Sequence, residues 1–313
     1  MEYLLSGYEI NEHGIYFSLS GYEYRVLINF NEIYDANGDY AKLFQMIKGE
    51  GVYSVSKKLE EMKLAPLHDS LNYLLCKETF DELTQVCFEN VKVDDSGTKV
   101  SKAMREKIYK VLNEIKMLKN ISIDIDAVIR GIERDLTGIK SICKLMIEIE
   151  KDDKQFESPF TNLILKDPKI PNEKEILFTY IILKHSLSFY QINIGPEILF
   201  EELLLQKTLI DIFKDAGRSV ERIFEEASLI KALLSKHDIT QSNDFFVKGK
   251  ENIFVSELIN NRDVSAYLLL NEFEKIIYFN KERFENIVNW IFILSFISKD
   301  LMQQKEATGH SKL

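Results

Sequence analysis

The chain has 313 residues, and its 50 acidic and 40 basic side chains give a formal net charge of −10. This balance disfavours a protein that binds the phosphate backbone of DNA or RNA, because a negative surface repels it. The sequence is 45% hydrophobic and 29% charged, with only 13 Gly and 5 Pro, which is typical of a globular protein and favours helices. We therefore expect one large or two medium domains.

Neither the cysteines nor the N-terminal residues show a pattern of disulfides, metal ligands or a targeting signal. Cys76, Cys87 and Cys143 stand among apolar neighbours without the close spacing of metal ligands, so buried free thiols are expected. No signal-peptide pattern opens the chain, and no run of about 18 apolar residues could span a bilayer. We expect no cofactor, no metal and no membrane partner, and a cytoplasmic location unless a signal peptide lies upstream.

Residues 1–34 show the alternation of a β-strand. One face of the alternating pattern consists of Tyr22, Tyr24, Val26, Ile28 and Phe30. Aromatic and β-branched residues in this pattern, with turn residues between the runs, predict two or three antiparallel strands at 8–10, 15–19 and 22–30. These five side chains form the candidate interaction face.

So small a sheet is marginal by itself in water. The strands therefore either pack on the helices that follow or form the edge of a larger sheet upstream of Met1. An exposed edge between Tyr3 and Phe30 could also pair with a second copy, so a homodimer is one expected assembly.

A first helical block is predicted over 35–150. Its short helices are expected at 39–48, 54–63, 67–77 and 79–90, with Pro66 separating the second from the third and Thr79 with Glu82 as a capping box. After a polar loop at 94–99, helices at 101–119 and 125–150 carry heptad-like apolar seams and form an antiparallel hairpin. The seam is either buried in a bundle or offered to a partner.

A second helical block is predicted over 151–313. The expected order is an irregular link to 171, helices at 172–190, 196–217 and 219–237, a loop at 238–252, a turn at 255–260, and a frayed tail from 303. The segment 263–297 then gives a short helix, an extended stretch at 276–279 and a helix containing Trp290, the only tryptophan. That last helix is apolar around most of its circumference and should be buried centrally.

The predicted fold is thus mostly α: a multi-helix, bundle-like array with a small N-terminal antiparallel β-hairpin or meander. No residue is predicted to be catalytic, cofactor-binding or metal-ligating. His68 with Asp69 suggests a helix start, and His185 a partly buried structural side chain. The DANGDY segment at 35–40 lacks the spacing of a calcium loop and indicates a turn. An enzymatic site would need a pocket that joins His68 or His185 to carboxylates.

Two stretches carry a resemblance to a known family. YEYRVLINFNEIYDANGDYAKLFQMIKGEGVYSVSKKLEEMKLAPLHDSLNYL (22–74) and VSAYLLLNEFEKIIYFNKERFENIVNWIF (264–292) resemble the C-terminal region of long, multidomain bacterial α-amylase-family glycosidases. In that family a similar region follows a catalytic (β/α)8 barrel and a β-sandwich-like domain. The family's catalytic Asp, Glu and second Asp have no counterpart here, so the resemblance implies a non-catalytic region.

The resemblance implies an accessory helical domain of an α-glucan-active glycosidase that supports the stability, assembly or positioning of the catalytic part. Its partner would be the upstream domains of the same protein, which it meets through the candidate interaction face. Direct α-glucan binding would require exposed aromatic platforms. The alternative is a free-standing helical protein-interaction module that docks a partner through the 101–150 hairpin.

Overall fold

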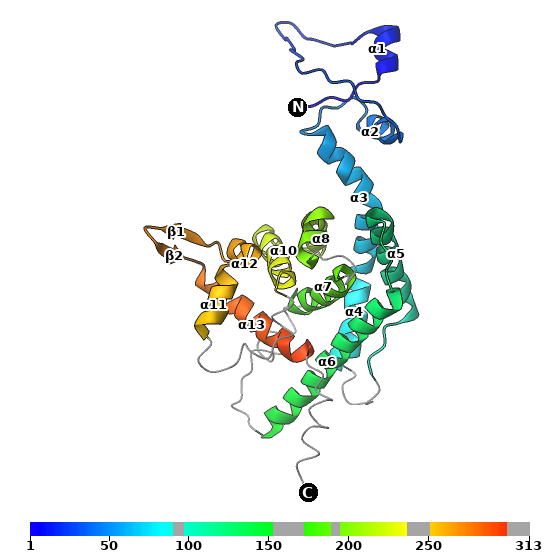
Figure 1. Ribbon diagram of the computed structural model, residues 1–313. Coiled ribbons are helices and arrows are strands. Elements are labelled where there is room, and N and C mark those ends of the chain that lie inside the picture. The colour runs from blue at the N-terminus through cyan, green and yellow to red at the C-terminus, as the bar shows by residue number, and fades with distance from the viewer. Residues whose placement is uncertain (90–96, 153–171, 189–194, 237–250, 299–313) are drawn as a thin grey trace. The chain divides into compact units, whose positions relative to one another are not determined.

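A computed structural model describes residues 1–89, 97–152, 172–188, 195–236 and 251–298 (Figure 1). The chain folds into two compact units, Met1–Pro66 and Leu67–Leu313. The blocks 1–34, 35–150 and 151–313 follow from composition and helical pattern, and they remain a prediction.

The fold is mostly helical, as predicted. The first unit contains α1 (Gly7–His13), α2 (Asp39–Ile47) and the start of α3 (Val55–Leu74). The described part of the second unit continues with α4 (Lys77–Thr84), the π-helix η1 (Gln85–Glu89), α5 (Lys102–Lys119), α6 (Ile125–Asp152), α7 (Asn172–Leu187), α8 (Pro196–Glu202), α9 (Leu205–Asp215), α10 (Val220–Leu234), α11 (Glu251–Ile259), α12 (Arg262–Tyr267) and α13 (Lys281–Ser298).

Among the described residues, one small antiparallel hairpin accompanies these helices, but it does not lie at the N-terminus. It pairs β1 (Asn271–Phe273) with β2 (Ile276–Tyr278), with Glu272 opposite Ile277. The mostly α fold with a small antiparallel strand pair is confirmed. The N-terminal position predicted for that pair is wrong. The pair lies near the C-terminal end of the described residues, and the extended stretch predicted at 276–279 supplies its second strand.

The strands predicted at 8–10, 15–19 and 22–30 are absent from the first unit, all of whose residues are described. Residues 8–10 lie in α1, which Ser6 caps by accepting a hydrogen bond from the backbone N–H of Glu9. Left-handed φ values at Tyr22 (69°) and Asn29 (61°) interrupt the extended course of the later stretch. A strand must pair its backbone groups with a neighbour. Between residues 1 and 66 only Glu2 and Val52 form such a bridge, so no sheet edge supports the expected homodimer.

Two helix boundaries in the first half differ from prediction. Pro66 does not separate two helices but lies inside the continuous α3. Thr79 does not open a helix either, because α4 begins after its N-cap residue, Cys76. Glu82, expected to complete a capping box with Thr79, instead accepts hydrogen bonds from the backbone N–H and hydroxyl of Ser101. Ser101 is in turn the N-cap of α5.

Two further boundaries differ in the second half. The helix predicted at 196–217 breaks at Leu204, which has a left-handed φ of 52° and separates α8 from α9. The turn predicted at 255–260 is mostly part of α11. Most of the link predicted at 151–171, most of the loop at 238–252 and the tail from 303 lie outside the described residues, while 151–152 belong to α6.

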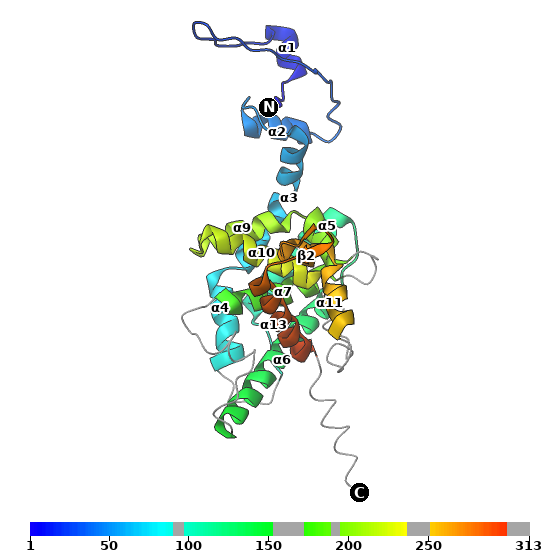
Figure 2. The same cartoon turned by 90° about the vertical axis from the view of Figure 1, so that its left-hand side faces the viewer.

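The core of the second unit is built around α13, as its apolar circumference predicts. Ile287, Trp290, Ile291, Ile293 and Leu294 are each no more than 1% exposed. The helix packs against α6 and α10, and Figure 2 shows α13 beside α6. Burial of Trp290 among these helices makes α13 a central element of the unit.

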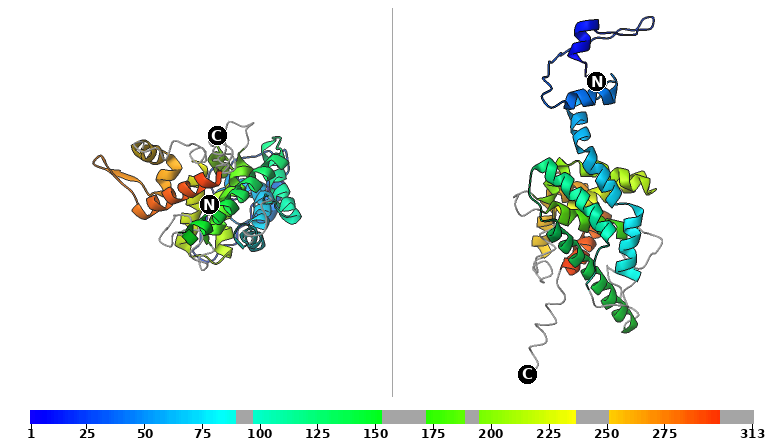
Figure 3. Two further views of the ribbon diagram at one scale, coloured as in Figure 1. Left: turned by 90° about the horizontal axis from the view of Figure 1, so that it is seen from below. Right: turned by 90° about the vertical axis from the view of Figure 1, so that its right-hand side faces the viewer.

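Most of the described heptad seam of α5 and α6 is buried within the same array, whereas Leu118 near the end of α5 is exposed. Its buried side chains are Met104, Ile108, Val111 and Ile115 on α5, and Ile129, Ile132, Leu136, Ile139 and Cys143 on α6. α6 also packs against α7 and α13, so the seam belongs to a bundle, and the two long helices can be followed in the right-hand view of Figure 3.

The first unit has a smaller core. Leu43 and Ile47 of α2 pack with Val55 and Leu59 of α3. Partly buried side chains around this cluster are Leu4, Tyr40, Val52 and Met62. None of them belongs to the candidate interaction face, whose residues lie outside this core.

Candidate functional site

The candidate interaction face is fully accessible in the structure. Its exposed fractions are 108% for Tyr22, 85% for Tyr24, 72% for Val26, 74% for Ile28 and 67% for Phe30. Scattered single apolar residues are common on protein surfaces, but a continuous run of this length is not. The run therefore marks a surface that another group can cover.

The exposure extends over a longer stretch, residues 15–34, which we name the N-terminal apolar segment. Its other exposed apolar side chains are Ile15, Tyr16, Phe17, Leu19, Ile33 and Tyr34. Figure 2 shows the stretch as an open loop between α1 and α2. Residues 22, 24, 26, 28 and 30 would share one face if the chain were extended as a strand.

This segment contains the turn of a hairpin, but not the backbone hydrogen bonds that would pair two strands on either side of it. The backbone N–H of Glu23 donates to the carbonyl oxygen of Ser20 at 3.0 Å. The Glu23 carboxylate accepts in return from the backbone N–H of Ser20 at 2.9 Å. Leu19, Tyr22 and Tyr24 line a surface hollow beside this turn. The segment thus has a fixed reversal point flanked by two alternating apolar runs.

The β1–β2 hairpin exposes apolar side chains in the second unit. Phe273, Ile276, Ile277, Tyr278 and Phe279 are all exposed. The hairpin projects beyond α12 and α13 in the left-hand view of Figure 3. Sequence reasoning foresaw the extended conformation of 276–279 but not its exposure, because a buried strand has the same apolar composition.

The two histidines considered from sequence have different surroundings. His68 Nε2 lies 2.8 Å from the carbonyl oxygen of Leu203, which is a structural contact between a helix and a loop. His185 Nε2 lies 2.8 Å from Oδ2 of Asp135, and the same oxygen accepts from Lys184 Nζ at 2.9 Å. Asp135 precedes His185 by 50 residues, so sequence spacing could not reveal this cluster.

Asp135 remains a carboxylate inside the protein because two partners compensate its burial. Burial raises the pKa of its carboxyl, but the hydrogen bond from His185 and the charge of Lys184 outweigh that effect, so the pKa lies below its usual value. Gly131, one turn earlier on α6, leaves room for the His185 ring: an added Cβ would lie 2.5 Å from Nδ1. The cluster fastens α6 to α7.

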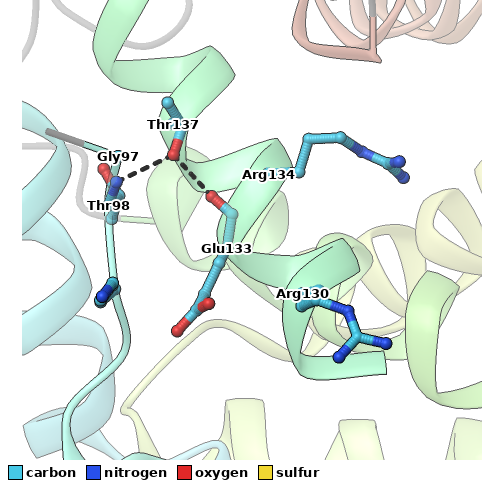
Figure 4. A pocket seen from close by; sticks show the side chains of 7 residues that line it. Gly97, Thr98, Arg130, Glu133, Arg134 and Thr137 are labelled. Carbon is cyan, nitrogen blue, oxygen red and sulfur yellow. Dashed lines mark hydrogen bonds between the residues drawn. The ribbon is translucent and has the colours of Figure 1, made fainter. Parts of the chain in front are cut away.

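A pocket of about 540 Å³ is lined by α6 and by the loop at 97–99 that precedes α5, but its charged groups do not converge (Figure 4). Thr98 N–H donates to Thr137 Oγ1 at 2.9 Å, which fixes the loop against the helix. The Glu133 carboxylate is engaged by Arg105, while Arg130 and Arg134 point away from Thr98 in Figure 4. Neither Asp135 nor His185 lines this pocket.

The DANGDY segment forms the expected turn into a helix. Asp35 Oδ2 accepts from the backbone N–H of Ala41 at 2.8 Å, and hydrogen bonds from this and neighbouring N–H groups hold the pKa of Asp35 below its usual value. Gly38 takes the left-handed φ of 73° that the turn requires. Within the described ranges, no cluster of three or more His, Cys, Asp or Glu residues could hold a metal, and no helix could cross a membrane.

Comparisons with protein-family models, with curated proteins and with solved structures found no match to this chain.

Proposed function

We propose that this chain is a non-catalytic accessory helical domain of an α-glucan-active, α-amylase-like glycosidase. It supports the stability, assembly or positioning of the catalytic part, in the cytoplasm. Its N-terminal apolar segment packs against the upstream domains of the same protein. The observation that supports this proposal is the exposure of five alternating apolar side chains, from Tyr22 to Phe30, beside a preformed turn.

The energetics favour pairing with a structured partner over folding of the segment by itself. Burying each of these side chains contributes about 1.5–3 kcal/mol. Ordering the backbone costs about 1–2 kcal/mol for every residue, including the polar residues between them. A hairpin that buries only one face gains too little to fold, whereas an existing sheet supplies both backbone partners and apolar cover.

The choice of partner rests on the resemblance described above. A β-sandwich-like domain that precedes this region would present the sheet that residues 15–30 require. Aliphatic side chains such as Val26 and Ile28 suit a protein interior better than a sugar ring, so α-glucan contact is secondary in this proposal. Exposed Tyr16 and Tyr34 are the rings that such contact would use.

The alternative function, docking of a partner on the 101–150 hairpin, lacks a comparable observation. Most of its described apolar seam is occupied by the rest of the bundle, as Ile108 and Ile132 illustrate with 0% exposure. A partner helix would have to displace those contacts.

The genomic test is the reading frame upstream of Met1. The proposal expects an open frame that encodes a barrel followed by a β domain. A start codon at Met1 with no such neighbour would overturn it.

The biochemical test compares two matched substitutions in the longer protein. Val26→Asp, at a site 72% exposed in this chain, should lower the thermal stability of the longer protein or its rate of α-glucan hydrolysis. Val220→Asp, at a site 65% exposed at the start of α10, is the control and should leave both unchanged. The accessory role would be contradicted if thermal stability and the rate of α-glucan hydrolysis were the same in both variants and in the longer protein from which this whole chain has been deleted.

A further inference from the structure

Cys76 differs from the other two cysteines in its surroundings. It is partly exposed at the N-cap of α4, whereas Cys87 and Cys143 are buried. Burial raises the pKa of the Cys143 thiol to about 12 and also raises that of Cys87. Buried, protonated thiols of this kind are inert, while thiols near cations and helix N-termini are the reactive ones.

A lysine from another helix lies against the Cys76 sulfur. Lys107 Nζ of α5 is 3.2 Å from Cys76 Sγ and donates to Thr79 Oγ1 at 3.0 Å. The Tyr73 ring lies below the same ammonium, with 4.6 Å between Nζ and the ring centroid. Thr79 and Tyr73 therefore hold the nitrogen at the separation of a near-attack pair from the sulfur.

A carboxylate stands beside the thiol as well. The hydrogen bond with Cys76 is the main cause that keeps the pKa of the Glu78 carboxyl below its usual value. Cys76 itself is partly exposed, so water can take the thiol proton. The amine of Lys107 has a fixed position next to the sulfur.

We propose that Cys76 and Lys107 form a redox-sensitive pair in which a hydroperoxide creates a covalent sulfur–nitrogen bond between Sγ and Nζ. In the first step the thiolate attacks the peroxide O–O bond. The sulfur gains one oxygen as sulfenic acid, and the other oxygen leaves as water, or as an alcohol from an organic peroxide. The sulfur is oxidised by two electrons and the peroxide is reduced by two.

The second step is a condensation without further oxidation. Lys107, after losing its ammonium proton to solvent, attacks the sulfenic sulfur, the S–N bond forms and water leaves. Overall the thiol and the amine each lose one hydrogen, and hydrogen peroxide becomes two waters. A thiol reductant reverses the bond by thiolate attack on the sulfur. The product is a reversible covalent link between the start of α4 and the second turn of α5.

The test treats the purified chain with hydrogen peroxide and maps its peptides by mass spectrometry. The expected product has lost two hydrogens, joins the Cys76 and Lys107 peptides, blocks Cys76 against alkylation after denaturation, and disappears with dithiothreitol. Lys107→Arg keeps the positive charge but removes the amine, so the joined peptide should be lost. Lys110→Arg is the matched control, because Lys110 lies 5.0 Å from the same Tyr73 ring, and it should retain the joined peptide.

Three results would overturn the proposal: oxidation of Cys76 in the unsubstituted chain without a joined peptide, a joined peptide that persists in Lys107→Arg, or no reaction at Cys76. Circular dichroism of each variant checks that the helices are intact, so that loss of the joined peptide can be assigned to the missing amine. The chain is used without any partner, and the outcome is therefore independent of the accessory role proposed above.

Discussion

The N-terminal apolar segment and α13 are both rich in regularly spaced apolar residues, yet they have opposite environments. Ile287, Trp290 and Ile291 of α13 are at most 1% exposed, whereas Tyr22 of the segment is fully exposed. The difference lies in the partner each element needs. Periodicity shows which side chains would gain from burial. It does not show whether the surface that buries them belongs to the same chain.

Backbone hydrogen bonding explains why only one of the two elements forms. A helix satisfies its own N–H and C=O groups, so α13 can form and then pack against α6 and α10. A strand, by contrast, makes its backbone ladder hydrogen bonds only with neighbouring strands. Without a neighbouring strand, residues 15–30 cannot form a sheet despite their β-propensity, and the segment stays an open loop.

The largest effect is expected from Trp290→Ala. Removing this fully buried ring should lower the free energy of unfolding by about 3–5 kcal/mol, because it leaves a cavity in the core. Tyr22→Ala removes a ring of similar kind from a fully exposed site and should change it by no more than about 0.5 kcal/mol in the isolated chain. Urea denaturation followed by circular dichroism measures both.

A comparable loss of unfolding free energy in both variants would show that Tyr22 is packed in solution. The N-terminal apolar segment and α13 would then not differ in burial.

The second prediction concerns the buried cluster that fastens α6 to α7. Asp135→Asn leaves Lys184 buried without its carboxylate and should cost about 3–5 kcal/mol of unfolding free energy. Glu202→Gln removes one partner of the exposed ion pair with Lys119 and should cost at most about 1 kcal/mol. If both substitutions cost the same, the cluster does not contribute to packing as described.

The same cluster gives a pH dependence. The folded-state pKa of Asp135 is lowered, so its contribution to stability is fully present above the unfolded pKa of about 4 and is lost as the pH falls through the lower folded value. The unfolding free energy of the unsubstituted chain should therefore fall more steeply below about pH 4 than that of Asp135→Asn. Denaturant titrations at a series of acidic pH values measure the slopes, and parallel curves would contradict the assignment.

A smaller effect is expected at Gly131. Replacing a helix-interior glycine by alanine ordinarily stabilises a protein by about 0.5–1 kcal/mol. Here the added Cβ would meet the His185 ring, so Gly131→Ala should instead destabilise by about 1–3 kcal/mol. Gly7→Ala in α1, where an added Cβ meets nothing within 4 Å, is the control and should have little effect. Stabilisation by Gly131→Ala would show that the ring is free to move.

Local pattern was sufficient for most helices and for the burial of Trp290. It failed where the outcome depends on distant residues. Pro66 predicted a helix boundary, yet α3 continues through it, and apolar side chains on both sides, Leu64 and Leu67, are buried. The contact between Asp135 and His185 has no sequence signal, since 50 residues separate them.

The central claim is that residues 15–34 acquire structure from a partner in a longer protein. Backbone hydrogen exchange of this segment, compared between the chain alone and the longer protein, tests it most directly. The account predicts rapid exchange throughout 15–34 in the chain alone and strong protection at alternating positions of 22–30 in the longer protein, with α13 protected in both. Equally rapid exchange of the segment in both proteins would contradict it.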